Sequence, residues 1–547
     1  MAYLIHIGLA LLAQAVWEET SPETTPRLWL VVLLCLVPHA LGAIAHRLYL
    51  RGMFRSADRF FALLSWSPVA LHALAVFNGG WLVLLEGWTA HPMRLMGWPT
   101  LWSALSFAPF VVYSLLGIDA RSRLGSGSTL RSRTARRFQM RLFLASLSPM
   151  LAYMLVSAAV GAIEPLRLRI ETVSAWSAAY AAAMLLVFAV SVPWLLRNSW
   201  ETEPMPEGVE RSLLESVSQL ANFDGHRLFI WRTGNTVANA AIIGLFPRHR
   251  VVLFSDLLLS QLDLRQLASV FAHEIGHAKK NHVLIFGAWA LAALFGADLL
   301  ATAIAPDDLT WNSVVLIGSM AIWVIGFGWM SRRFELEADI YSLRLIGDPA
   351  PLIGALEEVS GPHGRARTSW RHFSTQRRIE FLEAMTRDPG VAQRLERRLT
   401  WVARTGFVAF LIVAGIESFG LARAWPEQQV MLDLRQGAYA HAAQRIESRP
   451  RVDSDLANLT RRAATLRQGD MSELEAAARS ALARGDLEAF SEWLYLGALR
   501  GNDDMDRVGG LLSLWKSKPA PEADDLLALC PPAWREALGP LLREPPR

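Results

Sequence analysis

The sequence predicts a mainly α, polytopic membrane protein with an α+β domain among its membrane spans and a helical domain at its C-terminal end. Three observations predict this fold class. Hydrophobic residues make up 52% of the 547 residues and charged residues only 19%, a balance typical of polytopic membrane proteins. Apolar segments that approach the ~20 residues needed to cross a bilayer recur along the chain. Polar blocks with helix and strand patterns separate some of these segments.

Six apolar segments fall in an N-terminal membrane region, residues 1–196. They are residues 1–17, 28–44, 60–85, 101–116, 142–163 and 174–196. The first segment ends in Ala13-Gln-Ala15, which resembles a signal-peptidase site, although no charged region precedes it. We interpret this segment as a first short span, and a cleaved signal peptide is the alternative.

A mainly polar domain follows at residues 197–404. It includes two further predicted spans, residues 283–305 and residues 314–330. Residues 227–231 and residues 251–255 have the composition of short strands. Because helical segments surround these strands, we expect a mixed α+β domain here.

The last span is predicted at residues 405–422, and residues 423–547 follow it as a soluble helical domain. This tail is polar and rich in Ala and Arg. Its pattern fits a small helical domain as well as a solenoid of stacked helices, because the spacing is too irregular for a named repeat. A solenoid would imply a protein partner for the tail.

Two Arg-rich loops predict how the chain is oriented in the membrane. Residues 47–59 and residues 119–141 are both crowded with arginine. The positive-inside rule places such loops in the cytoplasm. Alternation of the spans then places residues 197–282 in the cytoplasm and residues 423–547 outside it. We therefore expect a multi-pass integral protein of the bacterial inner membrane.

Charge and cysteine content exclude two other classes. The formal net charge is only +4, and the basic residues cluster beside apolar segments, so we interpret them as topology signals and expect no nucleic-acid partner. The two cysteines, Cys35 and Cys530, lie at opposite ends of the chain and lack ligand spacing. A disulfide framework is therefore not expected.

The chemistry is centred on the motif His273-Glu274-x-x-His277. Residues four apart share one face of a helix, so the two imidazoles can hold one metal ion together. Glu274 can then reach a water on that ion, which is the arrangement of zinc metallopeptidases with two His ligands and a Glu as general base. Asp263 and Gln266 can form a capping box at the start of this helix. The alternative is a surface helix with two unrelated histidines.

A catalytic zinc site normally takes three protein ligands and a water, so a third ligand must lie elsewhere in the chain. Glu335 and Asp339 are four residues apart and share a helix face. Glu335 is the candidate third ligand, and Asp339 can orient a ligand histidine. Glu337 points off this face, and we expect it to be solvated. The alternative is a charged helix end that follows a membrane span.

Four motifs, in this order, resemble the integral-membrane zinc metalloproteases that include the type I CAAX prenyl protease and the HtpX heat-shock protease. They are Asn239-Ala-Ala-Ile-Ile-Gly244, His273-Glu-Ile-Gly-His277 followed by His282, Ser331-Arg-Arg-Phe-Glu-Leu-Glu-Ala-Asp339, and His372 six residues before Arg378. The resemblance covers about residues 228–382. It departs from the family at Phe373, where Pro is usual, in the six N-terminal spans, which exceed those of HtpX-like members, and in the C-terminal tail, which lies outside it.

The resemblance implies a membrane-embedded, zincin-like catalytic domain and further site residues. His372 is the candidate donor to the negative charge that develops on the substrate carbonyl. Arg378 could anchor the loop of His372 or hold a substrate carboxylate. Asn239 starts an extended stretch that could pair with the substrate backbone as an edge strand. The plainer alternatives are a basic surface loop for His372 and a turn residue for Asn239.

The sequence favours a zinc metalloendopeptidase with one Zn²⁺ per chain, bound by His273, His277 and Glu335. Both ligand sets lie within roughly 10 Å of a predicted span at 1.5 Å per residue. We therefore expect a metal-activated water to cleave membrane-associated proteins or peptides at the cytoplasmic surface of the lipid bilayer. One alternative is a signalling receptor metalloprotease with an extracytoplasmic sensor tail. The other is a non-catalytic membrane scaffold, against which the intact Glu274 argues.

Overall fold

The computed structural model describes most of the chain. The described residues are 2–20, 25–89, 105–124, 129–224, 227–304, 309–364, 370–448, 453–466 and 471–500. Cys530 and the rest of residues 501–547 lie outside the described residues. The chain folds into two compact units, Met1–Ala159 with Met184–Gly415, and Val160–Ala183 with Ile416–Arg547.

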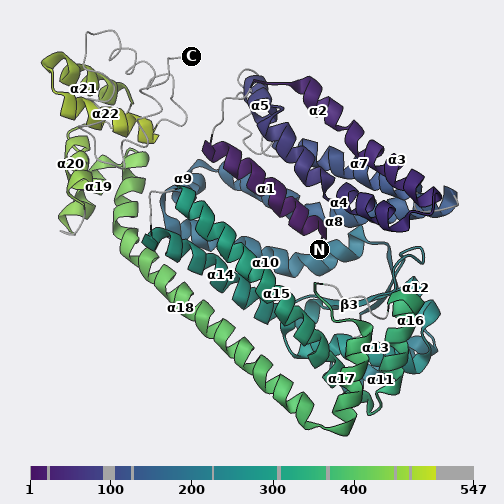
Figure 1. The fold of residues 1–547 in the computed structure, drawn as a ribbon. Helices are drawn as coiled ribbons and strands as arrows, with labels where there is room; N and C mark the ends of the chain where they lie inside the picture. Colours follow the sequence, from purple (N-terminus) through teal and green to yellow (C-terminus); the bar gives the residue numbers. More distant parts are fainter. Residues whose placement is uncertain are drawn as a thin grey trace. The chain divides into compact units, whose positions relative to one another are not determined.

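The N-terminal part of the first unit is helical throughout its described residues (Figure 1). Its helices are α1 (Ala2–Thr20), α2 (Leu28–Leu34), α3 (Leu36–Leu50), α4 (Phe54–Phe77), α5 (Trp81–Thr89), α7 (Ala108–Leu124) and α8 (Thr129–Gly161). Aromatic side chains fill one buried cluster among them, where the ring centroids of Phe107 and Phe110 lie 4.8 Å apart. Such helices bury large side chains against one another and present others outward, as spans in a bilayer do.

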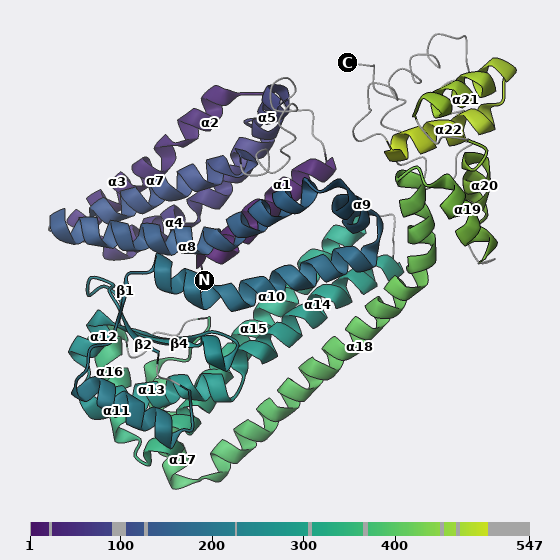
Figure 2. The same cartoon turned by 180° about the vertical axis from the view of Figure 1, so that it is seen from behind.

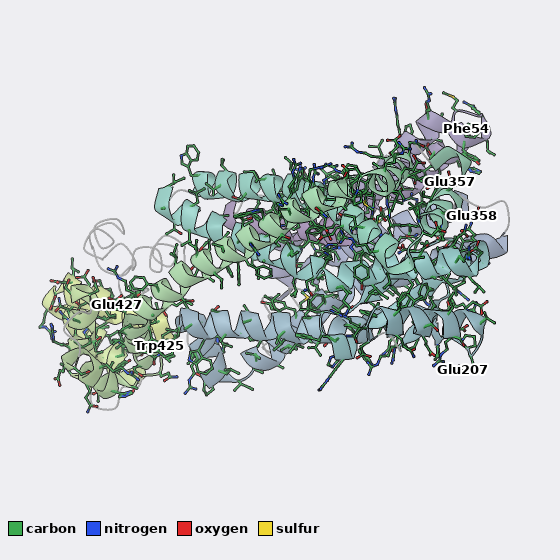
Figure 3. The ribbon with its side chains drawn as sticks, turned by 90° about the horizontal axis from the view of Figure 1, so that it is seen from below. Phe54, Glu207, Glu357, Glu358, Trp425 and Glu427 are labelled. Atoms are coloured by element: carbon green, nitrogen blue, oxygen red, sulfur yellow. The ribbon has the colours of Figure 1, made fainter. Side chains whose placement is uncertain are left out.

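Six helices in the described part of the chain are long and apolar enough to cross a membrane. They are Leu28–Leu50, Phe54–Phe77, Arg136–Gly161, Ser174–Ser199, Leu264–Ile304 and Gly390–Arg435. Each contains one of the nine predicted spans or overlaps it, so the chain is a multi-pass integral membrane protein. The other three predicted spans fall on α1, α7 and α15 (Leu309–Ile346), which are helical but do not belong to this set. Exposed apolar side chains such as Phe54 and Trp425 project from the spanning helices (Figure 3).

A small sheet forms the β part of the polar domain. It contains β1 (Thr202–Pro204), β2 (Leu228–Trp231), β3 (Ala240–Ile243) and β4 (Val251–Ser255), in the order β1-β2-β4-β3. The two predicted strands are therefore confirmed as β2 and β4. β4 is apolar and fully buried because it is central, with β2 parallel on one side and β3 antiparallel on the other. β3 lies at the edge of the sheet.

The helices that flank this sheet in the chain run from α10 to α18. They are α10 (Ser174–Ser199), α11 (Val209–Leu220), α12 (Asp256–Gln261), α13 (Leu264–Lys279), α14 (His282–Ile304), α15, α16 (Ala350–Gly364), α17 (Thr375–Arg387) and α18 (Gly390–Arg435), with a 3₁₀ turn at Pro247–His249. α13 lies beside the sheet (Figure 2). Its apolar face packs on the sheet, where the rings of Phe271 and Phe254 meet edge to face at 5.6 Å. This packing turns the opposite face of α13, with His273 and His277, toward α15.

The second unit is also helical in its described residues. It contains α9 (Glu164–Thr172), the adjoining end of α18, α19 (Tyr439–Glu447), α20 (Ser454–Ala463), α21 (Met471–Arg484) and α22 (Leu487–Arg500). A core of buried apolar side chains, among them Leu434, Tyr439, Phe490 and Trp493, holds the end of α18 and α19–α22 together. α9 contacts this end of α18 through Arg435, which donates to Thr172 and pairs with Glu171. The mainly α fold class with a helical C-terminal domain is thus confirmed.

Candidate metal centre

α13, which carries His273, Glu274 and His277, begins at a capping box and ends just before a residue with positive φ. The Asp263 side chain accepts a hydrogen bond from the Gln266 backbone N–H at 2.8 Å, and the Gln266 side chain accepts one from the Asp263 N–H at 3.0 Å. The predicted capping box is therefore confirmed. α13 ends at Lys279, and Asn281 takes a positive φ of 55° before α14 begins. His273, Glu274 and His277 consequently lie on a well-supported helix.

Gly276 brings α13 and α15 into close contact beside the motif. A Cβ atom built on Gly276 would lie 3.0 Å from Cβ of Tyr341 and 3.1 Å from Cα of Ala338. Ser342 on α15 also donates a 2.7 Å hydrogen bond to the backbone carbonyl of Ser269 on α13. This close approach places Glu335 and Asp339 opposite the two histidines.

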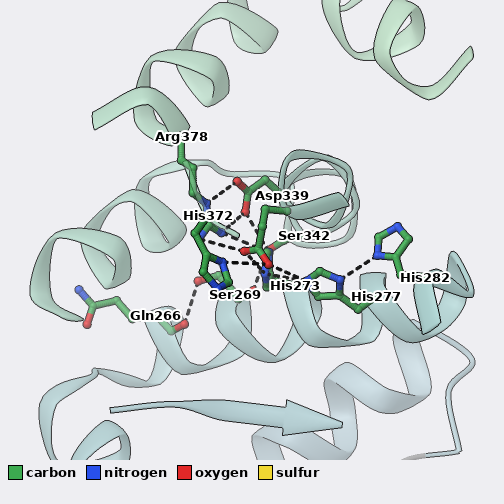
Figure 4. A network of polar contacts seen from close by, with 10 residues as sticks. Gln266, Ser269, His273, His277, His282, Asp339, Ser342, His372 and Arg378 are labelled. Atoms are coloured by element: carbon green, nitrogen blue, oxygen red, sulfur yellow. Dashed lines mark hydrogen bonds and ion pairs between the residues drawn. The ribbon is translucent and has the colours of Figure 1, made fainter. Parts of the chain in front are cut away.

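The three predicted ligands converge between α13 and α15. Figure 4 shows His273 and His277 on α13 beside Asp339. The Nε2 atoms of His273 and His277 lie 3.3 Å apart, and the two Glu335 carboxylate oxygens each lie 3.7 Å from one of them. One ligand atom from each residue can be chosen so that all lie within 4.8 Å of one another. Two imidazole nitrogens and one carboxylate oxygen are donors that suit zinc and leave a coordination position open. The donor set therefore fits the metal that the motif predicts.

Asp339 contacts the ring of His273 on the side away from these ligand atoms. Its Oδ1 lies 2.9 Å from Nδ1 of His273, and its side chain is fully buried. Burial would raise the pKa of Asp339, but the charge of Arg378 and hydrogen bonds from His273 and Arg378 hold that pKa below its ordinary value. The ionised carboxylate accepts the Nδ1 proton, so the Nε2 lone pair of His273 faces the ligand cluster.

Arg378 is enclosed between two carboxylates. Its Nε and Nη2 atoms donate to Asp339 at 2.9 and 2.5 Å, and its Nη1 lies 3.4 Å from Glu335. Burial lowers the pKa of Arg378, but the charges of Asp339 and Glu335 raise it overall. This guanidinium is engaged within the protein, an arrangement that favours its predicted role as an anchor over a contact with a substrate carboxylate.

The two remaining predicted site residues, His372 and Asn239, differ in their surroundings. His372 Nδ1 lies 3.2 Å from Glu335 Oε1, and the His372 side chain is 48% exposed. Burial would raise the pKa of Glu335, but the hydrogen bond from His372 and the charge of Arg378 lower it. Asn239 precedes the edge strand β3, and its backbone exchanges two 2.9 Å hydrogen bonds with Ser255. The Asn239 side chain is exposed at this edge.

Sequence reasoning was wrong about Glu337. This side chain was expected to be solvated, yet Glu337 is only 6% exposed and lies 3.0 Å from Nε2 of His282. The reason is that α14 covers the face of α15 that carries Glu337. The ring of His282 also stacks on Phe334 of α15 at 4.1 Å. Helix spacing alone could not reveal this contact, because it depends on how α14 returns after Asn281.

His282 connects Glu337 to the ligand His277. His282 Nδ1 lies 2.7 Å from Nδ1 of His277, and Lys280 Nζ lies 3.3 Å from Glu337. Glu274 and His277 line a small pocket of about 60 Å³ together with Ile242 of β3, the residues just after it and the first turn of α14. Both groups therefore border the same small open space.

Residues 207–396 match peptidase family M48. The chain is 27% identical over 207 residues to the CAAX prenyl protease 1 homolog of Arabidopsis thaliana, which covers 33% of this chain and 48% of that protein. It is 31% identical over 165 residues to the Protease HtpX homolog of Desulforapulum autotrophicum, which covers 27% of this chain and 52% of that protein. The crystal structure of S. mikatae Ste24p aligns with a TM-score of 0.37 and 16% identity, over 64% of this chain and 97% of that one.

The matched segments span about half the length of these two curated relatives. The family match includes all four motifs on which the resemblance was predicted, because residues 207–396 contain Asn239, the His273 motif, Glu335 and His372. The predicted resemblance to the membrane zinc metalloproteases is therefore confirmed, and the part of the chain that builds the candidate metal centre matches peptidase family M48.

Proposed function

We propose that this chain is a zinc metalloendopeptidase that cleaves membrane-associated proteins or peptides at the cytoplasmic surface of a bacterial inner membrane. The observation that carries the proposal is the convergence of His273, His277 and Glu335, with Glu274 beside them in the pocket. A zinc ion held by these three residues supplies a Lewis acid that polarises a carbonyl and lowers the pKa of a water.

Glu274 is the proton carrier in this proposal. Its carboxylate accepts a proton from the attacking water and delivers it to the amide nitrogen that leaves when the peptide bond breaks. One water is consumed, and a carboxyl and an amine result. Glu274 is only half-buried and lines the pocket, so its carboxylate can reach a bound peptide.

The substrate backbone lies along β3 in our proposal. β3 pairs with β4 on one side and is the edge strand of the sheet, so an extended peptide can add to its other side as a further strand. The Asn239 amide stands at the start of this edge and would extend the pairing. His372, which is half exposed and rests on Glu335, would donate to the oxygen of the scissile carbonyl.

Position in the chain supports a substrate close to the membrane. α14 begins at His282, five residues after His277, and its apolar length follows directly. The Arg-rich loops support a cytoplasmic location for this side of the membrane. Fusions of a reporter that is active only outside the cytoplasm test the orientation, because we expect silence near residue 250 and activity at residue 547.

Metal removal tests the activity itself. We expect the purified full chain to contain about one zinc ion, to cleave casein, to lose cleavage on chelation and to regain it when zinc is added. A zinc-free chain, or cleavage that survives complete chelation, would refute the proposal and leave the scaffold alternative. Deletion of residues 423–547 then separates a constitutive protease from a receptor, since only a receptor would lose its response to a stimulus.

A further inference from the structure

The pocket beside Glu274 contains a cation as well as the candidate catalytic groups. Arg250, which follows the 3₁₀ turn and precedes β4, lines the same pocket as Glu274 and His277. Apolar side chains form much of the remaining wall, namely Ile242, Leu245, Val283 and Leu284. The pocket thus presents one positive group within a mostly apolar lining, close to the position of the scissile bond.

Arg250 has no carboxylate partner among the described residues. It forms none of the ion pairs found within 4.0 Å in that part of the chain, and its Nε atom is buried without a hydrogen bond. Burial lowers the pKa of Arg250, and the charge of Asp224 offsets this only partly. Its guanidinium carbon lies 5.6 Å from the centroid of the Phe223 ring, a weak attraction compared with an ion pair. A partly desolvated cation that forms no ion pair among the described residues favours binding of an anion.

The other cations near the site differ from Arg250 in this respect. Arg378 contacts Asp339 and Glu335, and Lys280 contacts Glu337 and Glu396. Their charges are compensated within the protein. Arg250 is therefore the cation of this pocket that is available to an anionic group of a substrate.

The fold fixes the position of Arg250. Gly244, at the end of β3, has a φ of +121°, and a Cβ atom there would lie 3.0 Å from Cα of Arg250. The backbones of the two residues are therefore in direct contact, which ties Arg250 to the edge strand on which we place the substrate. A peptide that pairs with β3 would have a fixed register relative to Arg250, so the same position of the peptide would always face the pocket.

We propose that this pocket binds a carboxylate of the substrate next to the scissile bond and that Arg250 holds it. This inference rests on the proposed function and names the substrate class. The carboxylate can belong to an Asp or Glu side chain or to the free C-terminus of a short peptide. In either case the apolar wall covers the stem, and the guanidinium donates charge-assisted hydrogen bonds to the two oxygens.

The experiment measures kcat/KM of the zinc-loaded full chain on quenched fluorescent peptides. One set carries Glu, Gln or Lys in turn at each position that flanks the scissile bond. A second set ends in a free carboxylate or a carboxamide at increasing distance from that bond. We expect one position at which the carboxylate form is cleaved about 10- to 100-fold faster than its neutral isostere, as one charged hydrogen-bonded contact would produce. The set in which the preference appears identifies the source of the carboxylate.

The variant Arg250→Gln should remove this preference by slowing the carboxylate substrate and leaving the neutral one nearly unchanged. Arg250→Lys should restore part of it, because a cation remains. Arg248→Gln is the matched control, since Arg248 is exposed on the same turn and does not line the pocket. If Arg250→Gln fails to fold, Arg250→Lys decides the role of Arg250, because an unchanged preference in that variant would contradict it.

Two negative outcomes are distinguishable. Equal cleavage of carboxylate and neutral peptides at every position would overturn the role of Arg250 and leave the proposed protease intact. A preference that survives in Arg250→Gln would show that another group binds the carboxylate. Failure of the zinc-loaded chain to cut any peptide or casein would refute the proposed function, and this inference with it.

Discussion

The Nδ1 atoms of His277 and His282 lie 2.7 Å apart, so one of these two nitrogens donates a proton to the other. His282 Nε2 lies 3.0 Å from Glu337, a buried carboxylate that accepts a hydrogen bond from it. His282 Nδ1 is then the acceptor, and His277 donates its Nδ1 proton to it. This arrangement leaves the His277 Nε2 lone pair directed at the ligand cluster. His282 and Glu337 are positioning residues for His277 in this account.

Loss of this chain of contacts should weaken metal binding without abolishing it. We expect His282→Ala to lower zinc affinity by about 10- to 100-fold, the usual effect of removing a partner of a ligand histidine. Zinc dissociation constants measured by competition with a chelator check this. Glu337→Gln should retain much of the affinity because its amide oxygen still accepts from His282, whereas Glu337→Leu should not. Unchanged affinity in both His282→Ala and Glu337→Leu would contradict the assignment.

The contact between α13 and α15 at Gly276 should also be sensitive to substitution. Gly276→Ala inserts a methyl group about 3 Å from atoms of α15, so the helices must separate, at a typical cost of 1–3 kcal/mol of stability. We expect a lower melting temperature and weaker zinc binding, since Glu335 moves away from the histidines. Gly287→Ala in α14 is the control, because nothing lies within 4 Å of a Cβ atom there. Equal behaviour of the two variants would show that the helix spacing does not position Glu335.

The buried pair of Asp339 and Arg378 makes stability depend on pH. Because the folded state holds the pKa of Asp339 below its ordinary value of about 4, the pair's contribution is present above that pH. It is lost as the pH falls through the lower, folded-state pKa. The metal-free chain should therefore lose stability below about pH 4, as melting temperatures at a series of pH values would show.

Removing one member of this pair should be costly at neutral pH. Asp339→Asn leaves the Arg378 charge buried without its main partner, which typically destabilises a protein by about 3–5 kcal/mol. The same variant should show a flatter acid dependence, because the group that titrates is gone. Arg394→Gln, which removes an exposed ion pair with Asp388, should change stability by less than about 1 kcal/mol. Comparable losses in the two variants would argue against a special role for the buried pair.

His372 should affect turnover and not metal content. We expect His372→Ala to lower kcat by roughly 10²–10³, the usual loss for one donor to a developing oxyanion. Zinc content should stay at the wild-type level, because the three ligands remain. Steady-state kinetics combined with metal analysis on the same preparation checks both. Near-normal turnover of the zinc-loaded variant would mean that the oxyanion is stabilised by another group.

Much of the candidate site could be predicted because its parts are local in sequence. The capping box of Asp263 and Gln266 depends on residues three apart, and the facing imidazoles of His273 and His277 depend on helical spacing. The strand at Val251–Ser255 was evident from a short apolar run. Each of these features is fixed by the backbone of one element, so no knowledge of the tertiary fold was needed.

The parts that could not be predicted depend on contacts between elements. Glu337 is buried only because α14 returns along α15, and Arg250 reaches the pocket only because β3 and the turn before β4 meet at Gly244. No periodicity within a single segment carries this information. The predicted span at residues 314–330 lies on α15, which is not among the six long apolar helices and which continues without a break into the polar Glu335 motif.

The central claim is that Glu274 carries the proton in a zinc-dependent cleavage while His273, His277 and Glu335 hold the metal. The most direct test is zinc content and casein cleavage measured together for purified Glu274→Gln protein, beside His273→Ala, His277→Ala and Glu335→Ala. The account predicts wild-type zinc content with no cleavage for Glu274→Gln, and loss of zinc in the other three variants. A Glu274→Gln protein that is zinc-free, or that still cleaves casein, would contradict it.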